Sequence, residues 1–244
     1  MIPAIFNWSG GKDSSLALYR ILWQRQYDIR YLLTSVNGTH NRISMHGVRR
    51  ELLELQAKAI GIELVELLLP EMPSMEEYDA LMSATMQRFK TESLVHSVFG
   101  DIFLEDLKKY RDEKLAENGF TGVYPLWKED TRTLVEEFID LGFKTVVVCC
   151  SADKLDASFC GRIIDRQFLD DLPADVDPAG ENGEFHTFVF DGPLFPSPIP
   201  ITLGEKVYRT YPNPVEGGRE IGFWYQDLKQ KPRTTHSLHG VSRL

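Results

Sequence analysis

The chain has few of the features that mark secreted, membrane-bound or nucleic-acid-coating proteins. Three cysteines among 244 residues are too few for a disulfide framework. No apolar run approaches the roughly 18 residues that cross a bilayer, and the N-terminus lacks the basic segment of a signal peptide. The 27 Lys and Arg are outnumbered by 36 Asp and Glu, a net charge of −9, which argues against broad binding to nucleic acid. We therefore expect a cytoplasmic protein without membrane or nucleic-acid partners.

Two common phosphate-binding motifs are also missing. A Walker A loop needs a glycine, four residues and then Gly-Lys-Ser/Thr. Here Gly11 and Lys12 are followed by Asp13, and Phe6 stands where the first glycine should be. The dinucleotide motif G-x-G-x-x-G is absent as well. The chain instead reads "SGGKDS" over residues 9–14, between a short apolar run and an apolar-patterned stretch.

This hexapeptide has the composition of a loop that binds a chain of phosphates. Its two glycines let backbone amides approach oxygens closely, its two serines offer hydroxyls, and the helix expected after it adds a positive end. Lys12 can supply a full charge, and as a loop lysine we expect it to carry no core packing. Asp13 can cap the helix or hold Mg²⁺. The residues predicted to hold the phosphates are Ser9, Gly10, Gly11, Lys12, Asp13 and Ser14.

Strand and helix patterns alternate through the first half of the chain. We predict strands over 4–9, 29–36, 62–69, 97–102 and 121–127, and helices over 13–27, 46–60, 74–94 and 103–118. This order indicates an α/β fold with a five-stranded parallel sheet and helices on both faces. Ligands bind beyond the carboxyl ends of such strands. Polar stretches at those ends are Ser9–Ser14, Ser35–Gly38, Gly100–Asp101 and Trp127–Asp130.

The second half of the chain has a different character. A helix and the buried strand "TVVVCC" are expected over 131–150, so Cys149 and Cys150 are predicted to be core thiols. Residues 171–200 are rich in proline and are expected to be irregular, and β-rich runs follow at 206–212 and 220–228. We predict a domain that carries the phosphate-binding loop over 1–130, a smaller α+β substrate-side domain over 131–228 and a frayed tail over 229–244.

Several stretches together resemble one enzyme family. "SGGKDS" matches the PP-loop pattern S-G-G-x-D-S, and "ISMHGVRRELLELQAKAIGIEL", "VFGDI", "YPLW" and "GENGEFHTFVFDGPLF" follow in order. Over residues 3–205 the chain resembles the diphthine–ammonia ligases, a PP-loop branch of the adenine nucleotide alpha-hydrolase superfamily. The resemblance implies that ATP is cleaved between its α- and β-phosphates with Mg²⁺. A carboxylate acceptor, diphthine on an elongation factor in the reference enzymes, is adenylated, and ammonia then displaces AMP to give an amide.

The resemblance also implies roles for particular residues. Lys12 and Asp13 of the loop, with Glu184 and His186 of "GENGEFHT", are the predicted catalytic residues. In an extended segment Glu184 and His186 share one face and could orient ammonia or take its proton. The residues predicted to hold the nucleoside are Asn37, Gly100 and Asp101, and those predicted to bind Mg²⁺ are Asp13 and Asp101.

The sequence leaves alternatives open. Archaeal and eukaryotic ligases tend to read Glu-Tyr-Glu-Thr where this chain has Glu184-Phe185-His186-Thr187, which looks like a bacterial subgroup with a different acceptor. A non-catalytic ATP or AMP sensor, or a PP-loop enzyme that modifies tRNA, would carry the same loop. The acceptor, which could be protein-borne, the nitrogen source and the oligomeric state are not determined. His46 has no assigned role, and Asp156 and Arg162 are most simply interpreted as an internal ion pair.

Overall fold

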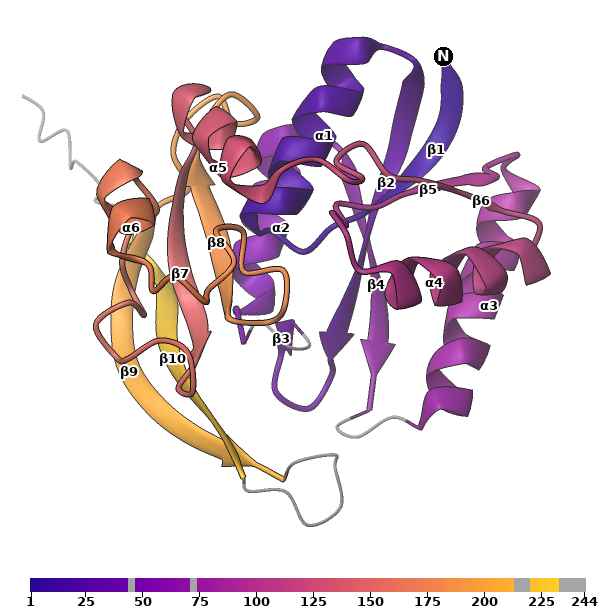
Figure 1. Cartoon of the computed structure of the whole chain (residues 1–244). Helices are drawn as coiled ribbons and strands as arrows, with labels where there is room; N and C mark the ends of the chain where they lie inside the picture. Colours follow the sequence, from indigo (N-terminus) through magenta and orange to yellow (C-terminus); the bar gives the residue numbers. More distant parts are fainter. Residues whose placement is uncertain (44–46, 71–73, 213–219, 233–244) are drawn as a thin grey trace, which may run out of the picture.

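The computed structural model describes residues 1–43, 47–70, 74–212 and 220–232. Its larger sheet has six strands in the order β3-β2-β1-β5-β6, with β4 pairing with β2 (Figure 1). The strands are β1 (Ile2–Asn7), β2 (Tyr27–Asn37), β3 (Arg42–Ile43), β4 (Glu63–Leu69), β5 (His96–Val98) and β6 (Thr121–Val123). All pairings are parallel except that of β3 with β2. The predicted five-stranded parallel sheet is therefore confirmed, and the two-residue β3 extends it.

Helices cover both faces of this sheet, as predicted. They are α1 (Lys12–Gln24), α2 (Arg50–Ile60), α3 (Met75–Thr91) and α4 (Glu105–Glu117). In Figure 1, α1 and α2 lie between the larger sheet and a second, smaller sheet, while α3 and α4 lie on the other side. Met86 and Phe89 of α3 pack with Leu33 of β2, and Leu18 of α1 packs in the core cluster that reaches the second sheet. The buried stripes of α1 and α2 thus join the two sheets.

The second half of the chain forms a four-stranded antiparallel sheet in the order β8-β7-β10-β9. Its elements are α5 (Thr131–Asp140), β7 (Lys144–Ser151), α6 (Arg166–Asp171), β8 (Phe185–Asp191), β9 (Ile201–Tyr211) and β10 (Ile221–Gln230). The expectation that 171–200 is irregular was wrong over 185–191. The prolines of this region stand outside that run, so nothing prevents it from pairing with β7.

Strand β8 is the edge of the second sheet that docks against the loop after β1. The amide of Val189 donates to the carbonyl of Gly10 at 2.9 Å. The side-chain amide of Gln56 donates to both of those residues' carbonyls, at 2.6 and 3.1 Å. The amide of Lys12 donates to the hydroxyl of Thr187 at 3.0 Å. These bonds fix the loop of residues 9–14 between the two halves of the chain.

The remaining structural predictions concern the thiols and the tail. Cys149 and Cys150 lie buried on β7, as predicted, and Cys160 is buried as well. Of the predicted tail, residues 229–230 end β10 instead of fraying, and 233–244 lie outside the described residues. No helix in the described ranges is long and apolar enough to cross a membrane.

Candidate active site

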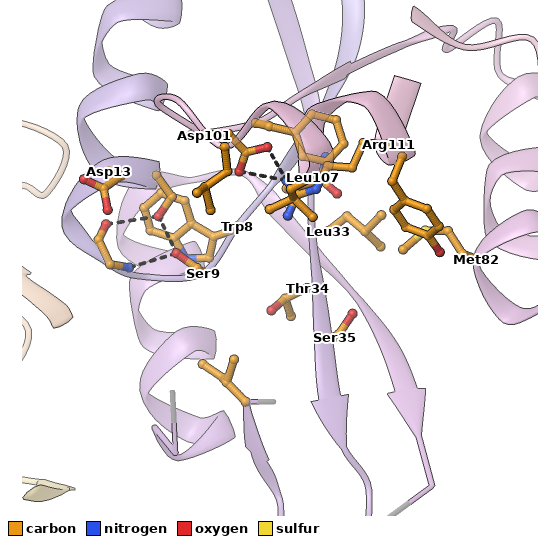
Figure 2. A pocket seen from close by; sticks show the side chains of 18 of the residues that line it. Trp8, Ser9, Asp13, Leu33, Thr34, Ser35, Met82, Asp101, Leu107 and Arg111 are labelled. Carbon is orange, nitrogen blue, oxygen red and sulfur yellow. Dashed lines mark hydrogen bonds and ion pairs between the residues drawn. The ribbon is translucent and has the colours of Figure 1, made fainter. Parts of the chain in front are cut away.

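A cavity of about 1140 Å³ lies at the carboxyl ends of β1 and β5, beside the longer strand β2 (Figure 2). The predicted site residues that line it are Ser9, Gly11, Lys12, Asp13, Ser14, Gly100, Asp101 and His186. The described lining residues do not include Gly10, Asn37 or Glu184, nor the predicted Trp127–Asp130 stretch. The structure therefore brings most of the predicted site residues together in one cavity. Gly10, Asn37 and Glu184 do not line it.

The loop of residues 9–14 is a backbone cradle. Gly10 has φ +75°, and a Cβ there would lie 2.5 Å from Oε1 of Gln56, so a larger residue is excluded on both counts. A Cβ on Gly11 would meet the backbone oxygen of Thr187 at 3.2 Å. The hydroxyl of Ser9 donates to that of Ser14 at 2.9 Å. Helix α1 begins at Lys12 without a side-chain cap from the N-cap residue Gly11, and the hydroxyl of Thr187 accepts from its first amide.

Lys12 is buried, contrary to the expectation that it carries no packing. Only 3% of it is exposed. Its ammonium donates to the carbonyl of Ala179 and pairs with Asp13 at 2.8 Å, and it lies 5.3 Å from the ring centroid of Phe185. Ala179 and Phe185 come from the far half of the chain, so Lys12 joins the phosphate-type loop to the second sheet.

Three of the carboxylates that line the cavity are close enough to influence one another. Burial raises the pKa of Asp13 and of Asp101, against the opposing influence of Lys12 and Arg111. Burial also raises the pKa of Glu181 to about 7, and repulsion from Asp13 adds to it. Asp101 pairs with Arg111 at 2.7 Å, as the dashed lines of Figure 2 show. The raised pKa values show that the local cations do not fully compensate these carboxylates.

A divalent cation would offset the negative charge of these buried carboxylates. Mg²⁺ is usually held by one or two carboxylates together with phosphate oxygens. The described residues contain no ready-made cluster of three or more ligands for a metal. The carboxylates of Asp13 and Asp101 therefore fit a cation that arrives with a phosphate ligand better than one bound by protein alone.

The 177–184 loop closes the cavity from the side of the second sheet, and two carboxylates organise it. Glu184, 3% exposed, accepts from the amides of Asp177 and Asn182 at 3.1 and 3.0 Å and from the Asn182 side chain at 3.1 Å. Asp177 in turn accepts from the amides of Ala179 and Glu181, at 2.9 and 3.1 Å. Glu184 is thus turned into the loop, and Glu181 is the glutamate of this motif that lines the cavity.

His186 lines the cavity from β8. Burial, with a smaller contribution from the charge of Lys12, lowers its pKa to about 4, so its imidazole is neutral at pH 7. Phe185, the preceding residue, packs against Phe168, with ring centroids 5.5 Å apart. Phe185 also lines the cavity, so β8 gives the site both an anchored aromatic ring and a polar side chain.

The opposite lobe of the cavity contains apolar side chains. Leu33, Met82 and Leu107 line it, and Thr34 and Ser35 add hydroxyls near the end of β2 (Figure 2). Charged side chains of α3 and α4, such as Asp79 and Lys114, also line the cavity. An apolar slot with a few polar groups is the usual form of a site for a flat ring.

Asn37 lies away from this lobe. Its side-chain oxygen accepts from the amides of Thr39 and His40, both at 3.0 Å, and so closes the turn after β2.

Three further residues, Asp156, Arg162 and His46, were named from the sequence without being placed in the cavity. Arg162 pairs with Asp171 at 2.7 Å, and Asp156 accepts from the amide of Ser158 at 2.7 Å. The predicted ion pair between Asp156 and Arg162 was therefore wrong. His46 lies outside the described residues.

Sequence reasoning missed several residues of the site. The missed residues are Thr34, Arg111, Asp177, Glu181 and Thr187, whereas Ser35 belongs to the predicted Ser35–Gly38 stretch and lines the cavity. Glu181 and Thr187 lie inside the "GENGEFHT" motif. The motif therefore identified the right segment of the chain, but it did not show which of its residues face the cavity. Arg111 gives no sequence signal, since an arginine on a charged helix is ordinarily solvated.

A parallel sheet with an "SGGKDS" cradle at the end of β1, facing carboxylates across a deep cavity, defines an enzyme of the PP-loop ATP pyrophosphatase type. Two family models agree with this class. The diphthamide synthase N-terminal domain matches residues 3–121, and the diphthamide synthase C-terminal domain matches residues 130–214. The chain belongs to the diphthamide synthase family. A comparison with curated proteins finds no match.

Proposed function

We propose that the protein is an ATP-dependent, amide-forming ligase that acts through an acyl-adenylate and releases AMP and pyrophosphate. The observation that carries the proposal is the cradle of residues 9–14, which includes Asp13, in one cavity with Asp101 and Glu181. Ligand pockets commonly measure about 300–1,000 Å³, and this cavity of about 1140 Å³ has room for a nucleotide and part of a second substrate.

The phosphate end of the site is formed by residues 9–14. Glycine at positions 10 and 11 lets the loop pack closely against Gln56 and Thr187, and the start of α1 contributes its positive end to the phosphates. Lys12 neutralises charge on the departing pyrophosphate. Asp13 and Asp101 would hold Mg²⁺, which would supply positive charge to offset that of the phosphates.

The nucleoside end is the apolar lobe. Leu33, Met82 and Leu107 enclose the base, and the hydroxyls of Thr34 and Ser35 offer hydrogen bonds to it or to the ribose. At Gly100 a Cβ would lie 2.9 Å from the amide of Ser14. Gly100 therefore lets β5 approach the start of α1 and keeps the nucleotide path open.

The acceptor side is formed by the second sheet. His186, neutral at pH 7, accepts a hydrogen bond from ammonia and orients it toward the activated carboxylate. Glu181, with a pKa of about 7, is suited to take the proton that ammonia loses when the C–N bond forms. Glu184 holds the 177–184 loop that carries Glu181.

A pyrophosphate–ATP exchange assay tests the adenylate step. Enzyme, Mg²⁺, ATP and labelled pyrophosphate are combined with a diphthine-bearing elongation factor, and the acceptor is left out in the control. Exchange that requires the acceptor but not ammonium supports an acyl-adenylate. A nucleotide sensor would bind ATP without exchange, and exchange without any acceptor would contradict the proposed order of steps. If diphthine is inactive but another carboxylate supports exchange, the chemistry stands and the acceptor differs.

A further inference from the structure

Strand β9 is an open edge of the second sheet. The sheet order places it at the opposite side from β8, so among the described strands only β10 pairs with it. Large apolar side chains on it are exposed: Leu203 to 57%, Tyr208 to 50% and Tyr211 to 43%. An 11-residue edge with exposed apolar side chains is a ready template for pairing with another strand.

One usual protection of an edge strand is weak here, and a second covers only the first half of β9. A lysine often guards an edge by extending its charge across it, but the ammonium of Lys206 donates to the carbonyl of Ala157 at 2.6 Å and is held on its own chain. The pairing with β10 shifts register between Leu203 and Lys206, which marks a bulge. From Lys206 to Tyr211 the strand runs without a further shift.

The sequence of β9 is complementary to itself in the antiparallel direction. If two copies pair about Val207, Glu205 stands opposite Arg209 of the partner subunit. Two-fold symmetry produces each contact twice. Directly opposed side chains of antiparallel strands are close enough to attract or repel. Within the described ranges no ion pair uses Glu205 or Arg209 internally.

We propose that the protein self-associates through β9, which pairs antiparallel with β9 of a second copy about Val207. The two four-stranded sheets then form one continuous sheet, with Glu205 and Arg209 as the charges that set its register. At the other edge of the sheet, β8 packs against the loop of residues 9–14. The cavity of each subunit therefore remains open in the dimer. The inference does not depend on the proposed activity.

Charge reversal tests both the surface and the register. Sedimentation of the full chain at several concentrations should show a monomer–dimer equilibrium. Glu205→Arg and Arg209→Glu should each weaken dimerisation about tenfold or more, because each turns two attractive contacts into two repulsive ones. Mixing the two single variants should restore a dimer, since every contact in the mixed pair joins opposite charges. The double variant should restore it as well.

The control is Lys109→Glu, an exposed charge on α4, which should leave dimerisation unchanged. At a concentration low enough for every chain to be monomeric, melting temperatures of all variants should match, because both β9 charges are exposed. Two results would overturn the proposal. One is a wild-type chain that stays monomeric at every concentration. The other is a dimer that neither reversal weakens, or that the mixed variants fail to recover.

Discussion

Glu184→Gln separates a positioning role for this residue from a catalytic one. In the structure the carboxylate is buried and accepts three hydrogen bonds, at 3.1, 3.0 and 3.1 Å. Hydrogen bonds to a charged group contribute about 1.5–3 kcal/mol each. Glutamine keeps one acceptor oxygen but turns an amide toward an N–H donor, so at least one bond is lost and a buried donor is left unpaired. We expect the free energy of unfolding to fall by about 2–4 kcal/mol.

The same change should affect turnover only indirectly. Without the Glu184 carboxylate the 177–184 loop is less rigid, and Ala179 and Glu181 are less firmly positioned. Because Ala179 contacts Lys12 of the 9–14 loop, we expect KM for ATP to rise more than kcat falls. Urea denaturation and steady-state kinetics on the same preparation measure both quantities. Asn182→Ala, which removes only the side-chain bond, is the matched control and should cost about 1 kcal/mol. Unchanged stability with a fall in kcat of about 10²- to 10⁴-fold would refute the reasoning and make Glu184 a proton-transfer residue.

Three further predictions follow from the site. Because burial raises the pKa of Glu181 from 4.5 to about 7, its ionisation should lower stability as pH rises through that interval, and Glu181→Gln should flatten this part of a stability–pH curve measured with urea. Lys12→Met should lower both the melting temperature and the calorimetric affinity for ATP, since the ammonium is buried against the second sheet; a variant that loses affinity alone would contradict that packing. Gly100→Ala should weaken ATP binding, because its Cβ would lie 2.9 Å from the amide of Ser14, whereas Gly38→Ala, with 3.4 Å to its nearest neighbour, should bind ATP normally.

Local patterns were sufficient for the first sheet but not for the second. Apolar runs alternating with helical spacing predicted β1, β2 and β4 because parallel strands buried on both faces read as continuous apolar stretches. Strand β8 was missed because proline density over 171–200 dominated the prediction, although residues 185–191 contain none. The average proline content of residues 171–200 does not show that a short run within them lacks proline and can pair with β7.

The roles of individual site residues depended on tertiary contacts. "GENGEFHT" contains two glutamates, and only the fold shows that Glu184 turns into its own loop while Glu181 faces the cavity. The burial of Lys12 arises from Ala179 and Phe185, more than 160 positions along the chain. Asn37 followed a strand end as expected, but its local hydrogen bonds close a turn instead. Such outcomes require knowledge of which distant segments meet.

The most direct test of the proposed activity is the identity of the products formed from ATP. The enzyme is incubated with Mg²⁺, ammonium, a diphthine-bearing elongation factor and ATP labelled in the γ-phosphate, and the nucleotides and phosphates are separated by chromatography. If the loop of residues 9–14 binds the departing pyrophosphate, as we propose, the label appears in pyrophosphate and AMP forms in equal amount. Label in orthophosphate, with ADP as the nucleotide product, would contradict this.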